Sequence, residues 1–500
     1  MIIVRNLSVH EIQKNRTLIE NLSFTAHSGD RIAIIGQEGV GKSTLIKTIL
    51  GLKEEHLLVE GDVQISGTIG YLEQALPKDK ESNTLFEYLL IEENYDLYSE
   101  CLFVLAKFGV DTSNVERRLS TFSGGELVKI MLTRVLLQEP DNILLDEPSN
   151  NLDLETIVFL EDFIKNSDAT IIFVSHDQSL LEKCANGVIN LALIHKQTKA
   201  HSTFMRLPYS EFYDEYIRKY EKQVQVAQKQ RSEYKRKVER FTRIFQKVEH
   251  QQNQAVRDPS LGRLLAKKMH SLKSQEKRLD REKSNFAKIP QKEESINIFF
   301  DEATSVARGR ILLSICNMDL RINEALLVSD INLVLKGRDK IGIIGKNGSG
   351  KTTLLKEVIR QLETKRIRYG YVSQNYEEIL DYSSNLLGYV LAAQEKYLEG
   401  DTRKILGNLG ISHQEMNSPV GSVSEGQKLK VILFILICRD SEVLILDEPT
   451  RNISPINQNE ILSLFNSFKG AIVAVSHDRT FLNSVVDEIY EISNKEFKKL

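Results

Sequence analysis

The chain of 500 residues carries 66 lysines and arginines against 69 acidic residues, a formal net charge of −3 at pH 7. This length exceeds what one hydrophobic core supports and predicts two or three domains. The longest apolar run, 431–438, is far too short to cross a bilayer, which excludes a membrane-spanning protein. The four cysteines are isolated, with no Cys-x-x-Cys pair, so they predict buried thiols in a reducing compartment and exclude disulfides and zinc sites.

The chain begins with a strand-like run, Ile2-Ile3-Val4, without a charged-then-apolar signal segment, which indicates a cytoplasmic location. A second strand-like run, 31–35, leads into a Gly-x-x-x-x-Gly-Lys-Ser segment and then into a helical stretch. A phosphate-binding loop requires this context, because backbone N–H groups and a helix N-terminus surround the phosphates and the lysine reaches the terminal ones. The nucleotide-binding candidates of this loop are Gly36, Gly39, Gly41, Lys42, Ser43 and Thr44.

A buried strand at 142–145 ends in an acidic pair, Asp146-Glu147. Asp146 is suited to holding Mg²⁺ through water, with the Ser43 hydroxyl on the metal, and Glu147 is suited to polarising the attacking water as general base. His176, in Ser-His-Asp after a further strand, is placed to contact the γ-phosphate. An ordinary exposed turn and a structural histidine are the plainer alternatives, and the recurrence of all these motifs in the second half of the chain disfavours both.

The middle of the chain changes to a helical pattern in which apolar or aromatic residues recur at steps of four and three. Two such runs, separated by a polar break from Gln251 to Ser260, predict an antiparallel helical hairpin with a coiled-coil seam. Its first helix would be roughly 65–70 Å long. The seam residues are Tyr213, Ile217, Tyr220, Val224, Ala227, Tyr234, Val238, Phe241, Phe245 and Val248 in the first run, interrupted by Arg231, and Leu265, Met269, Leu272, Leu279 and Phe286 in the second.

The hairpin also gathers the positive charge of the chain. Residues 211–290 hold 21 lysines and arginines against 11 acids, which leaves a net charge of −13 on the remainder. Such separation favours a polyanionic partner, and RNA contacts of this kind go to phosphates and 2′-hydroxyls. A solvated spacer or a protein-docking arm is the alternative, and the uncharged 251–254 is a candidate contact to a tRNA end or an rRNA loop. The candidate RNA-binding residues near the tip are Arg243, Lys247, Arg257, Arg263, Lys267 and Lys268.

The motifs of the first part recur after the hairpin. Gln74 and Gln374 lie 300 residues apart, and Glu147 and Glu448 lie 301 apart, so the offset is nearly constant and indicates a tandem duplication. The phosphate loops lie 309 apart, which predicts about nine extra residues in the first copy, near 57–67. The second copy contributes Gly345, Gly348, Gly350, Lys351, Thr352 and Thr353 as its phosphate loop, Thr352 and Asp447 as metal candidates, Glu448 as general base and His477 as the γ-phosphate contact.

Further motifs resemble those of ATP-binding cassette ATPases. The segment Ser123-Gly124-Gly125-Glu126 is similar to the signature, Gln74 and Gln374 are similar to the Q-loops, and DEPSNNLD at 146–153 is similar to Walker B and the D-loop. Two cassettes joined by a basic hairpin, with no transmembrane part, resemble the ABC-F family over essentially all 500 residues. The resemblance implies an α/β fold with two tandem P-loop ABC ATPase domains, at 1–206 and 293–500, joined by an antiparallel coiled-coil hairpin linker at 207–292.

Membership in this family would imply a soluble ATPase that uses ATP and Mg²⁺ and binds the ribosome as a monomer. The hairpin would reach from the tRNA exit site toward the peptidyl-transferase centre, to regulate translation or to protect against antibiotics that bind there. The two cassettes would close head-to-tail on two ATPs. In that state the further nucleotide-binding residues would be Ser123, Gly124 and Gly125 of one signature, Ser424 and Gly426 of the other, and Gln74 and Gln374, which would also contact the metal.

The second copy departs from the family pattern. Its signature has Glu425 in place of a glycine, and its D-loop reads Arg451-Asn452-Ile453-Ser454. Head-to-tail closure would bring this signature to the site built on Lys42, where a carboxylate near the γ-phosphate is unfavourable. We therefore expect the Lys42 site to bind or turn over ATP more weakly than the Lys351 site. Upstream of Lys42, at the place of an adenine-stacking aromatic, the sequence offers only His10 as a weak substitute.

Three other classes of protein share parts of this pattern. The ATPase component of an ABC transporter has no need of a long basic hairpin between its two cassettes. In DNA-repair and chromosome-organising ATPases a much longer coil splits a single cassette, whereas each cassette is intact here. A binding protein without turnover would fit the altered second signature, but both Walker glutamates are present.

Overall fold

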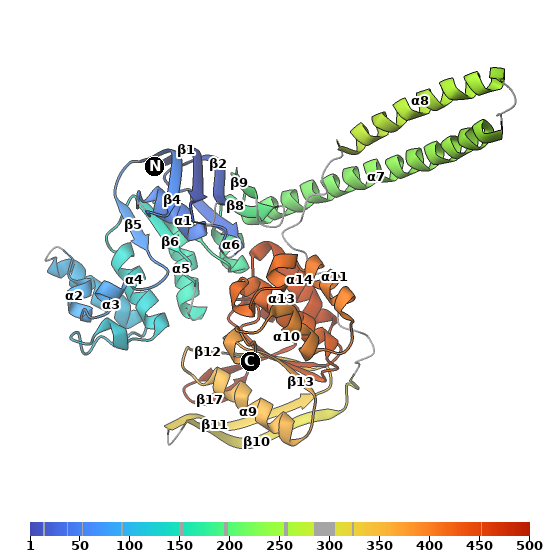
Figure 1. The fold of residues 1–500 in the computed structure, drawn as a ribbon. Helices are drawn as coiled ribbons and strands as arrows, with labels where there is room; N and C mark the ends of the chain where they lie inside the picture. Colours follow the sequence, from blue (N-terminus) through green and yellow to red (C-terminus); the bar gives the residue numbers. More distant parts are fainter. Residues whose placement is uncertain are drawn as a thin grey trace. The chain divides into compact units, whose positions relative to one another are not determined.

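The computed structural model describes the chain except for residues 14–15, 38, 53, 92–93, 150–151, 153, 195–198, 255–258, 285–305, 323–324 and 452. Inside helices and strands, side chains are not described at 154–155, 193–194, 199, 252–254, 259–263, 276 and 280–284. The described residues form two compact units, one from Met1–Ser210 with Glu293–Leu500 and one from Glu211–Lys292 (Figure 1). The first unit holds both cassettes, and the second holds most of the hairpin.

The first cassette is organised around a sheet whose described strands lie in the order β5-β6-β7-β3-β8-β9. Neighbouring strands are parallel except β9, which runs antiparallel to β8 at one edge. Strands β6 and β7 are buried at every position, as expected of parallel strands with both faces covered. The strands are β3 (Arg31–Gly36), β5 (Ile69–Leu72), β6 (Asn142–Asp146), β7 (Thr170–Val174), β8 (Gly187–Ile194) and β9 (Lys199–Met205).

A second, antiparallel sheet of this cassette has the order β2-β1-β4. Its strands are β1 (Ile2–Glu11), β2 (Arg16–Ala26) and β4 (Leu57–Ile65). Strand β4 coincides with the extra segment predicted near 57–67, and the second cassette has no strand at this point in its described residues. The extra residues therefore extend the sheet that carries β1.

The helices of the first cassette follow the strands in the expected α/β alternation. Helices α1 and α4 begin at the phosphate loop and at the signature, as the motifs predict. The helices are α1 (Lys42–Ile49), α2 (Leu85–Leu89), α3 (Tyr95–Lys107), α4 (Gly124–Leu136), α5 (Leu154–Asn166) and α6 (Gln178–Cys184), with short 3-10 turns at Lys78–Lys80 and Leu119–Thr121.

The second cassette repeats this plan with one continuous sheet in the order β10-β11-β17-β16-β12-β15-β14-β13. Strands β13, β14, β15, β12 and β16 are parallel, which matches the parallel strands of the first cassette. The strands are β10 (Ile311–Ile322), β11 (Ala325–Lys336), β12 (Lys340–Gly345), β13 (Tyr369–Val372), β14 (Val443–Asp447), β15 (Ala471–Val475), β16 (Glu488–Ser493) and β17 (Glu496–Lys499). The helices are α9 (Lys351–Thr364), α10 (Leu386–Ala393), α11 (Glu399–Asn408), α12 (His413–Met416), α13 (Glu425–Cys438), α14 (Pro455–Ser467) and α15 (Arg479–Val485), with 3-10 turns at Tyr376–Glu378 and Val420–Ser422.

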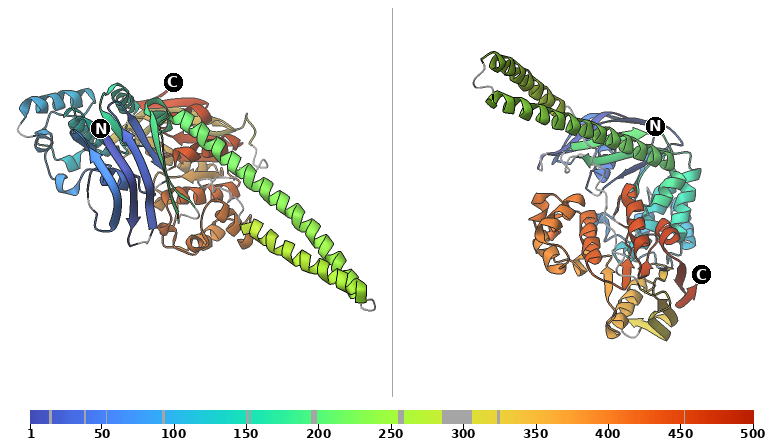
Figure 2. Two further views of the ribbon diagram at one scale, coloured as in Figure 1. Left: turned by 90° about the horizontal axis from the view of Figure 1, so that it is seen from above. Right: turned by 90° about the vertical axis from the view of Figure 1, so that its right-hand side faces the viewer.

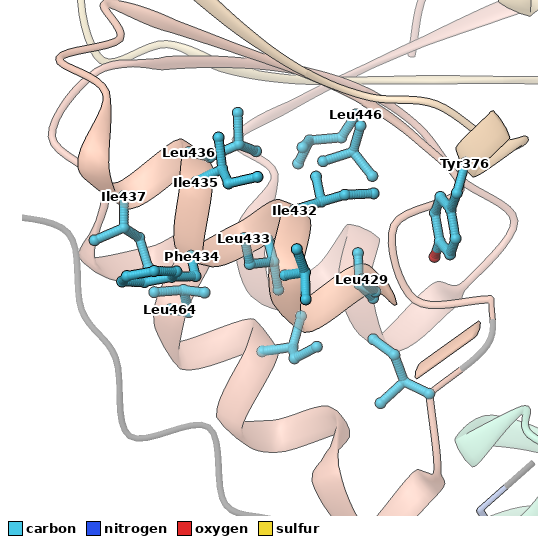
Figure 3. Packing of buried hydrophobic residues seen from close by; sticks show 14 of the residues in the cluster. Tyr376, Leu429, Ile432, Leu433, Phe434, Ile435, Leu436, Ile437, Leu446 and Leu464 are labelled. Carbon is cyan, nitrogen blue, oxygen red and sulfur yellow. The ribbon is translucent and has the colours of Figure 1, made fainter. Parts of the chain in front are cut away.

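Helix α13 is the central element of the second cassette. Every residue from Gln427 to Ile437 is buried, and its apolar side chains pack against Leu446 of β14 and Leu464 of α14 (Figure 3). A helix buried on all sides is expected to be mainly apolar, as α13 is from Val431 to Cys438. Because the signature opens this helix, the core of the cassette fixes the direction in which Ser424 and Glu425 are presented.

The linker forms the predicted helical hairpin. Helix α7 (Tyr209–Gln254) has 46 residues and α8 (Pro259–Ser284) has 26, and the two run side by side in Figures 1 and 2. At the tip, Val248, Leu265 and Leu272 are 2–5% exposed and pack with three further residues of the predicted seam, Phe241, Phe245 and Met269. Phe286 lies outside the described residues. These contacts confirm the seam register near the tip.

One prediction about the hairpin is wrong at its boundary. The polar stretch Gln251–Gln254 was expected to break the helix, but it forms the last turn of α7. A row of glutamine and asparagine costs a helix little, so polarity alone does not end it. Helix α7 ends at Gln254, and α8 begins at Pro259, a residue that fits the first turn of a helix. In the described part of the chain, no helix combines the length and apolarity needed to span a bilayer.

Candidate nucleotide-binding sites

The two phosphate loops share one backbone conformation, which only glycine adopts readily. A Cβ added at Gly36 would lie 2.2 Å from the carbonyl oxygen of Leu191 in β8, whereas a Cβ at Gly39 would meet nothing within 4 Å. The first glycine thus permits close packing on the sheet, whereas the second faces open space and is required by its positive φ. The φ angles are 149°, 73° and 101° at Gly36, Gly39 and Gly41, and 152°, 77° and 97° at Gly345, Gly348 and Gly350.

The loop lysines stand at the start of α1 and α9 and turn back over their loops. Lys42 Nζ donates to the carbonyl oxygens of Gly36 and Gln37 at 3.1 and 3.0 Å, and Lys351 makes the two equivalent contacts at 2.8 and 2.9 Å. The two lysines are 6% and 8% exposed. Each ammonium is therefore held where the terminal phosphates of a nucleotide would lie.

The residues predicted to hold Mg²⁺ lie together in both cassettes. Thr352 Oγ1 donates to Asp447 Oδ2 at 2.9 Å, and Asp146 and Asp447 are 2% and 1% exposed. Burial raises the pKa of both aspartates. Among the described residues Asp146 Oδ1 has no hydrogen-bond partner although it is buried. Hydroxyl and carboxylate oxygens are ligands that Mg²⁺ prefers, so these residues fit the metal, which when bound would neutralise phosphate charge.

The two candidate general bases, Glu147 and Glu448, have a left-handed backbone, with φ of 50° and 52°. Such strain costs a non-glycine residue of order 1–3 kcal/mol and gathers at functional sites. His176 Nε2 lies 3.6 Å from Glu147 Oε1, and His477 Nε2 lies 3.7 Å from Glu448 Oε1. Both cassettes therefore bring base and histidine together with the same geometry.

The environment of Glu448 suits a proton acceptor. Burial raises the pKa of Glu448 to about 7, and the carboxylate of Asp447 acts in the same direction. The backbone N–H of His477, 3.3 Å from Glu448 Oε2, and the charges of Lys351 and Arg451 lower the pKa. A carboxylate whose pKa lies near neutral pH accepts a proton more readily than an ordinary one.

One cavity lies over each phosphate loop, and both are large enough for a small-molecule ligand. The cavity over the second loop has a volume of about 410 Å³ and that over the first about 390 Å³. The second-loop cavity is lined by Lys351, Thr352, Thr353, Gln374, Asp447, Glu448 and His477, and on its other side by Ser149, Leu152, His176 and Asp177 of the first cassette. The first-loop cavity is lined by Lys42, Ser43, Thr44, Gln74, Glu147 and His176, and by Arg451 of the second cassette.

The D-loop of the second cassette reaches the site of the first. His176 Nδ1 lies 3.0 Å from the carbonyl oxygen of Ile453, and Arg451 lines both cavities. Arg451 stood out in the sequence only as a departure from the family pattern. Its cationic side chain adds positive charge to both phosphate sites.

The two signatures do not line either cavity. Both begin a helix with a serine cap, but the described lining residues include neither serine nor the residues after it. The contacts of Ser123, Gly124, Gly125, Ser424 and Gly426 to nucleotide therefore stay predictions. The Q-loop glutamines do lie at the sites, since Gln74 Nε2 donates to Glu147 Oε2 at 3.2 Å and Gln374 lines its cavity.

Three residues of the first-loop cavity are not predicted by any sequence motif. Glu11, Arg16 and His56 line the cavity over the first loop, whereas His10, which the sequence offered, is absent from that lining and bonds to Thr17. Arg16 is fixed by a 2.9 Å ion pair to Glu11 and donates to the carbonyl oxygen of Gly39. No sequence motif marks these residues, because β1, β2 and β4 bring them to the loop only when folded.

The structure describes the side chains of four of the six predicted RNA-binding residues. Arg243 and Lys247 are exposed on α7, and Lys267 and Lys268 are exposed on α8, all near the tip of the hairpin. Arg257 lies outside the described residues. Arg263 belongs to α8, and its side chain is not described.

Two phosphate loops, each with a buried aspartate, a strained glutamate and a histidine, have the arrangement expected of a nucleotide-hydrolysing protein. The sequence profile of the ABC transporter family matches residues 19–150 and 328–451. The chain belongs to the ATP-binding cassette family, within its ABC-F group, and is an ABC-type ATPase.

Several relatives extend over nearly the whole chain. The ATP-binding protein Uup of Escherichia coli (strain K12) is 30% identical, covering 95% of this chain and 77% of that protein. ABC transporter F family member 5 of Arabidopsis thaliana is 24% identical over 97% of this chain and 74% of its own. The ribosome protection protein VmlR of Bacillus subtilis (strain 168) is 28% identical over 97% and 86%.

A solved structure shares the fold of the chain. The RNase-L Inhibitor aligns with a TM-score of 0.64 at 17% identity, covering 99% of this chain and 89% of that one. This likeness supports the fold of the chain.

Proposed function

We propose that this ATPase binds the ribosome in its ATP-bound state and uses the basic hairpin to contact ribosomal RNA and tRNA. The hairpin would act near the peptidyl-transferase centre, to regulate translation or to protect against antibiotics that bind there. The name of the Bacillus subtilis relative, a ribosome protection protein, supports a ribosomal partner. Regulation and protection both require the protein to bind the ribosome, and the residues of this chain bear on that step.

The observation that carries the proposal is the placement of charge. The hairpin segment 211–290 has 21 lysines and arginines against 11 acids in a chain whose net charge is −3. Arg243, Lys247, Lys267 and Lys268 all stand exposed near its tip. A long helical arm with exposed cations near its end suits the phosphate-rich surface of structured RNA.

The nucleotide sites supply the switch in this proposal. Lys42 and Lys351 bind the terminal phosphates, while Glu147 and Glu448 orient and deprotonate the attacking water. Ser43, Thr352, Asp146 and Asp447 would hold Mg²⁺. Closure would require each signature to reach the phosphate loop of the other cassette, so ATP binding would favour one arrangement and hydrolysis would release it.

The first experiment is co-sedimentation of the Glu147→Gln/Glu448→Gln protein with bacterial ribosomes, with and without ATP, at two salt concentrations. Loss of both bases should lower turnover at least about 100-fold and preserve the ATP-bound state, because general-base catalysis contributes 10²–10⁴-fold. We expect pelleting that depends on ATP and weakens with salt. Absence of pelleting in both nucleotide states would overturn the proposal and favour a transporter partner or another nucleic acid.

Charge variants test whether the hairpin makes the contact. Replacing Arg243, Lys247, Lys267 and Lys268 by glutamine should weaken ribosome binding and flatten its salt dependence by roughly one unit of slope per lost contact. The matched control replaces four exposed lysines of the second cassette, Lys336, Lys365, Lys404 and Lys498, by glutamine. Equal weakening by both sets would show attraction through overall charge and count against a hairpin contact.

A further inference from the structure

The altered signature of the second cassette has the same backbone as the unaltered one. Ser123 and Ser424 both have φ −65° and ψ 157°, and neither Gly124 nor Glu425 has a positive φ. The caps also match, because Ser424 Oγ accepts the N–H of Gln427 at 3.3 Å and the first cassette has the same bond at the same length. The replacement of glycine by Glu425 therefore changes the side chain and leaves the main chain as it was.

The Glu425 carboxylate does not stand alone. Lys428 Nζ lies 2.6 Å from Glu425 Oε1, one turn further along α13. The same ammonium lies 4.1 Å from the ring centroid of Tyr382, at cation–π distance. The side chain of Lys428 is 6% exposed and that of Glu425 32%. Glutamate followed by lysine in this order is the favourable orientation on a helix, and burial holds the lysine in place.

All three residues of this cluster differ from the residues at the equivalent positions of the first cassette. At the offset of 301, Glu425, Lys428 and Tyr382 correspond to Gly124, Leu127 and Glu81. Hydrogen bonds confirm the last correspondence, because the N–H of Gly421 donates to Tyr382 O at 3.0 Å and that of Ser120 donates to Glu81 O at 3.1 Å. A carboxylate thus enters the signature together with a cation to pair with it and an aromatic ring to cover that cation.

The charge of the signature turn shows the consequence. In the first cassette the turn ends with Glu126, whose carboxylate closes the capping box, and has no cation among residues 123–127. In the second cassette Gln427 closes the box, and Glu425 and Lys428 cancel. The altered turn is formally neutral, whereas the unaltered turn carries one negative charge. The ion pair with Lys428 thus offsets the charge on which the expected weakness of the Lys42 site rests.

We propose that Lys428 is a positioning residue for the ATP site built on Lys42. It holds the carboxylate of Glu425 and neutralises it, so that the altered signature can approach a γ-phosphate as the unaltered one does. The inference rests on the head-to-tail closure of the proposed function, because only closure brings this signature to the other cassette. Lys428 would act through Glu425 and would not itself touch the nucleotide.

A double-substitution cycle tests this role. In the Glu448→Gln background the remaining ATP turnover reports the Glu147 base. Lys428→Leu should lower this turnover about tenfold, because an unpaired carboxylate then faces the γ-phosphate. The Glu425→Gly/Lys428→Leu protein, which restores the residues of the first cassette, should recover to within about twofold. Lys428→Arg, which keeps the charge, should also retain turnover.

Two results would overturn the inference. If the double variant is as inactive as Lys428→Leu, Lys428 acts by packing on Tyr382 and not through Glu425. If Lys428→Leu keeps full turnover, Lys428 has no role at this site. Lys430→Leu is the matched control, because Lys430 is a buried lysine of the same helix whose ammonium donates to Leu409 O. Any turnover that Lys430→Leu loses should not be restored by Glu425→Gly.

A second measurement keeps the test decisive if turnover in the Glu448→Gln background is too low. The affinity of the Lys42 site for a fluorescent ATP analogue, measured with the Glu147→Gln/Glu448→Gln protein, should follow the same cycle of loss and rescue. Neither measurement needs ribosomes. Failure of ribosome binding would therefore leave this inference standing, and failure of the cycle would leave the ribosomal proposal untouched.

Discussion

At the scale of single residues, the sites combine strained backbone and buried carboxylates, which lower the stability and are offset by the rest of the fold. Glu147 and Glu448 keep a left-handed backbone, and Asp146 and Asp447 are almost fully buried. Beside them Asp177, the residue after His176, carries a half-buried carboxylate. Such groups are expected where function outweighs stability.

Asp177 leads to a prediction about pH. Burial raises its pKa from 3.8 to about 6, and the carboxylates of Asp478 and Glu161 act in the same direction. Between these two pKa values the folded state holds a proton on Asp177 that the unfolded state does not. The contribution of this proton to the stability is fully present below pH 3.8 and is lost as the pH rises through about 6. Asp177→Asn keeps an acceptor for the Leu180 N–H and should raise stability at pH 7.5 by about 1–2 kcal/mol.

Thermal midpoints of the wild type and Asp177→Asn at pH 4.5 and pH 7.5 check this expectation. The advantage of the variant should shrink at the lower pH, where Asp177 of the wild type is largely protonated. An advantage of the same size at both values would show that charge burial is not its cause.

At the scale of elements, the hairpin shows how a polar segment keeps a defined packing. Both of its helices are rich in charge, so they depend on a narrow apolar seam. Near the tip that seam consists of Phe241, Phe245, Val248, Leu265, Met269 and Leu272. Among the described residues these six side chains pack together near the tip, so each is expected to contribute to its stability.

Two adjacent leucines give a matched test of the seam. Leu265 is 4% exposed and Leu264 is 64% exposed, although both lie on α8. Leu265→Ala should destabilise the tip by about 2–4 kcal/mol, since it leaves a cavity against Val248. Leu264→Ala should change stability by less than about 0.5 kcal/mol.

Hydrogen exchange of the hairpin amides measures both effects directly. Faster exchange near residues 241–254 is expected for Leu265→Ala alone. Equal acceleration in the two variants would contradict the seam and indicate that helix propensity, not packing, holds the tip.

At the scale of the whole molecule, an ion pair joins the two cassettes, and the matching positions of the duplication do not repeat it. Glu161, 4% exposed in the first cassette, accepts from Arg479 Nη1 of the second at 3.0 and 3.2 Å. At the offset of 301, the equivalent pair would be Leu462 and Gln178, which cannot form an ion pair. The duplication has therefore diverged where its copies meet.

Arg479→Gln should weaken the coupling between the cassettes. Removing one partner of a buried ion pair is costly, although Lys183 Nζ, 2.8 Å from Glu161, still compensates part of the charge, so we expect a loss of about 1–3 kcal/mol. Calorimetry should show the unfolding transitions of the two cassettes moving apart. Lys183→Gln removes a partner within one cassette and should destabilise without that separation; separation in both variants would contradict a special role for Arg479.

Local chemistry made much of this molecule predictable from its sequence. Glycine spacing specifies the phosphate loops, because few other residues adopt their φ angles. A strand that ends in Asp146-Glu147 and a period of three and four along α7 likewise carry their meaning within a short window. The polar run Gln251–Gln254 wrongly predicts a helix break, because polarity alone does not end a helix, and α7 includes these residues.

Tertiary structure alone decided which residues join those local motifs. Arg16 and His56 reach the first phosphate loop, and Arg451 reaches both sites, through strands and loops distant in the chain. The sequence showed Glu425 as a departure in the second signature, and only the fold revealed that the ring of Tyr382 covers Lys428, its partner one turn along the helix. The physical reason is that motifs record backbone needs over a few residues, whereas the charge balance of a site is set by whatever the fold brings near.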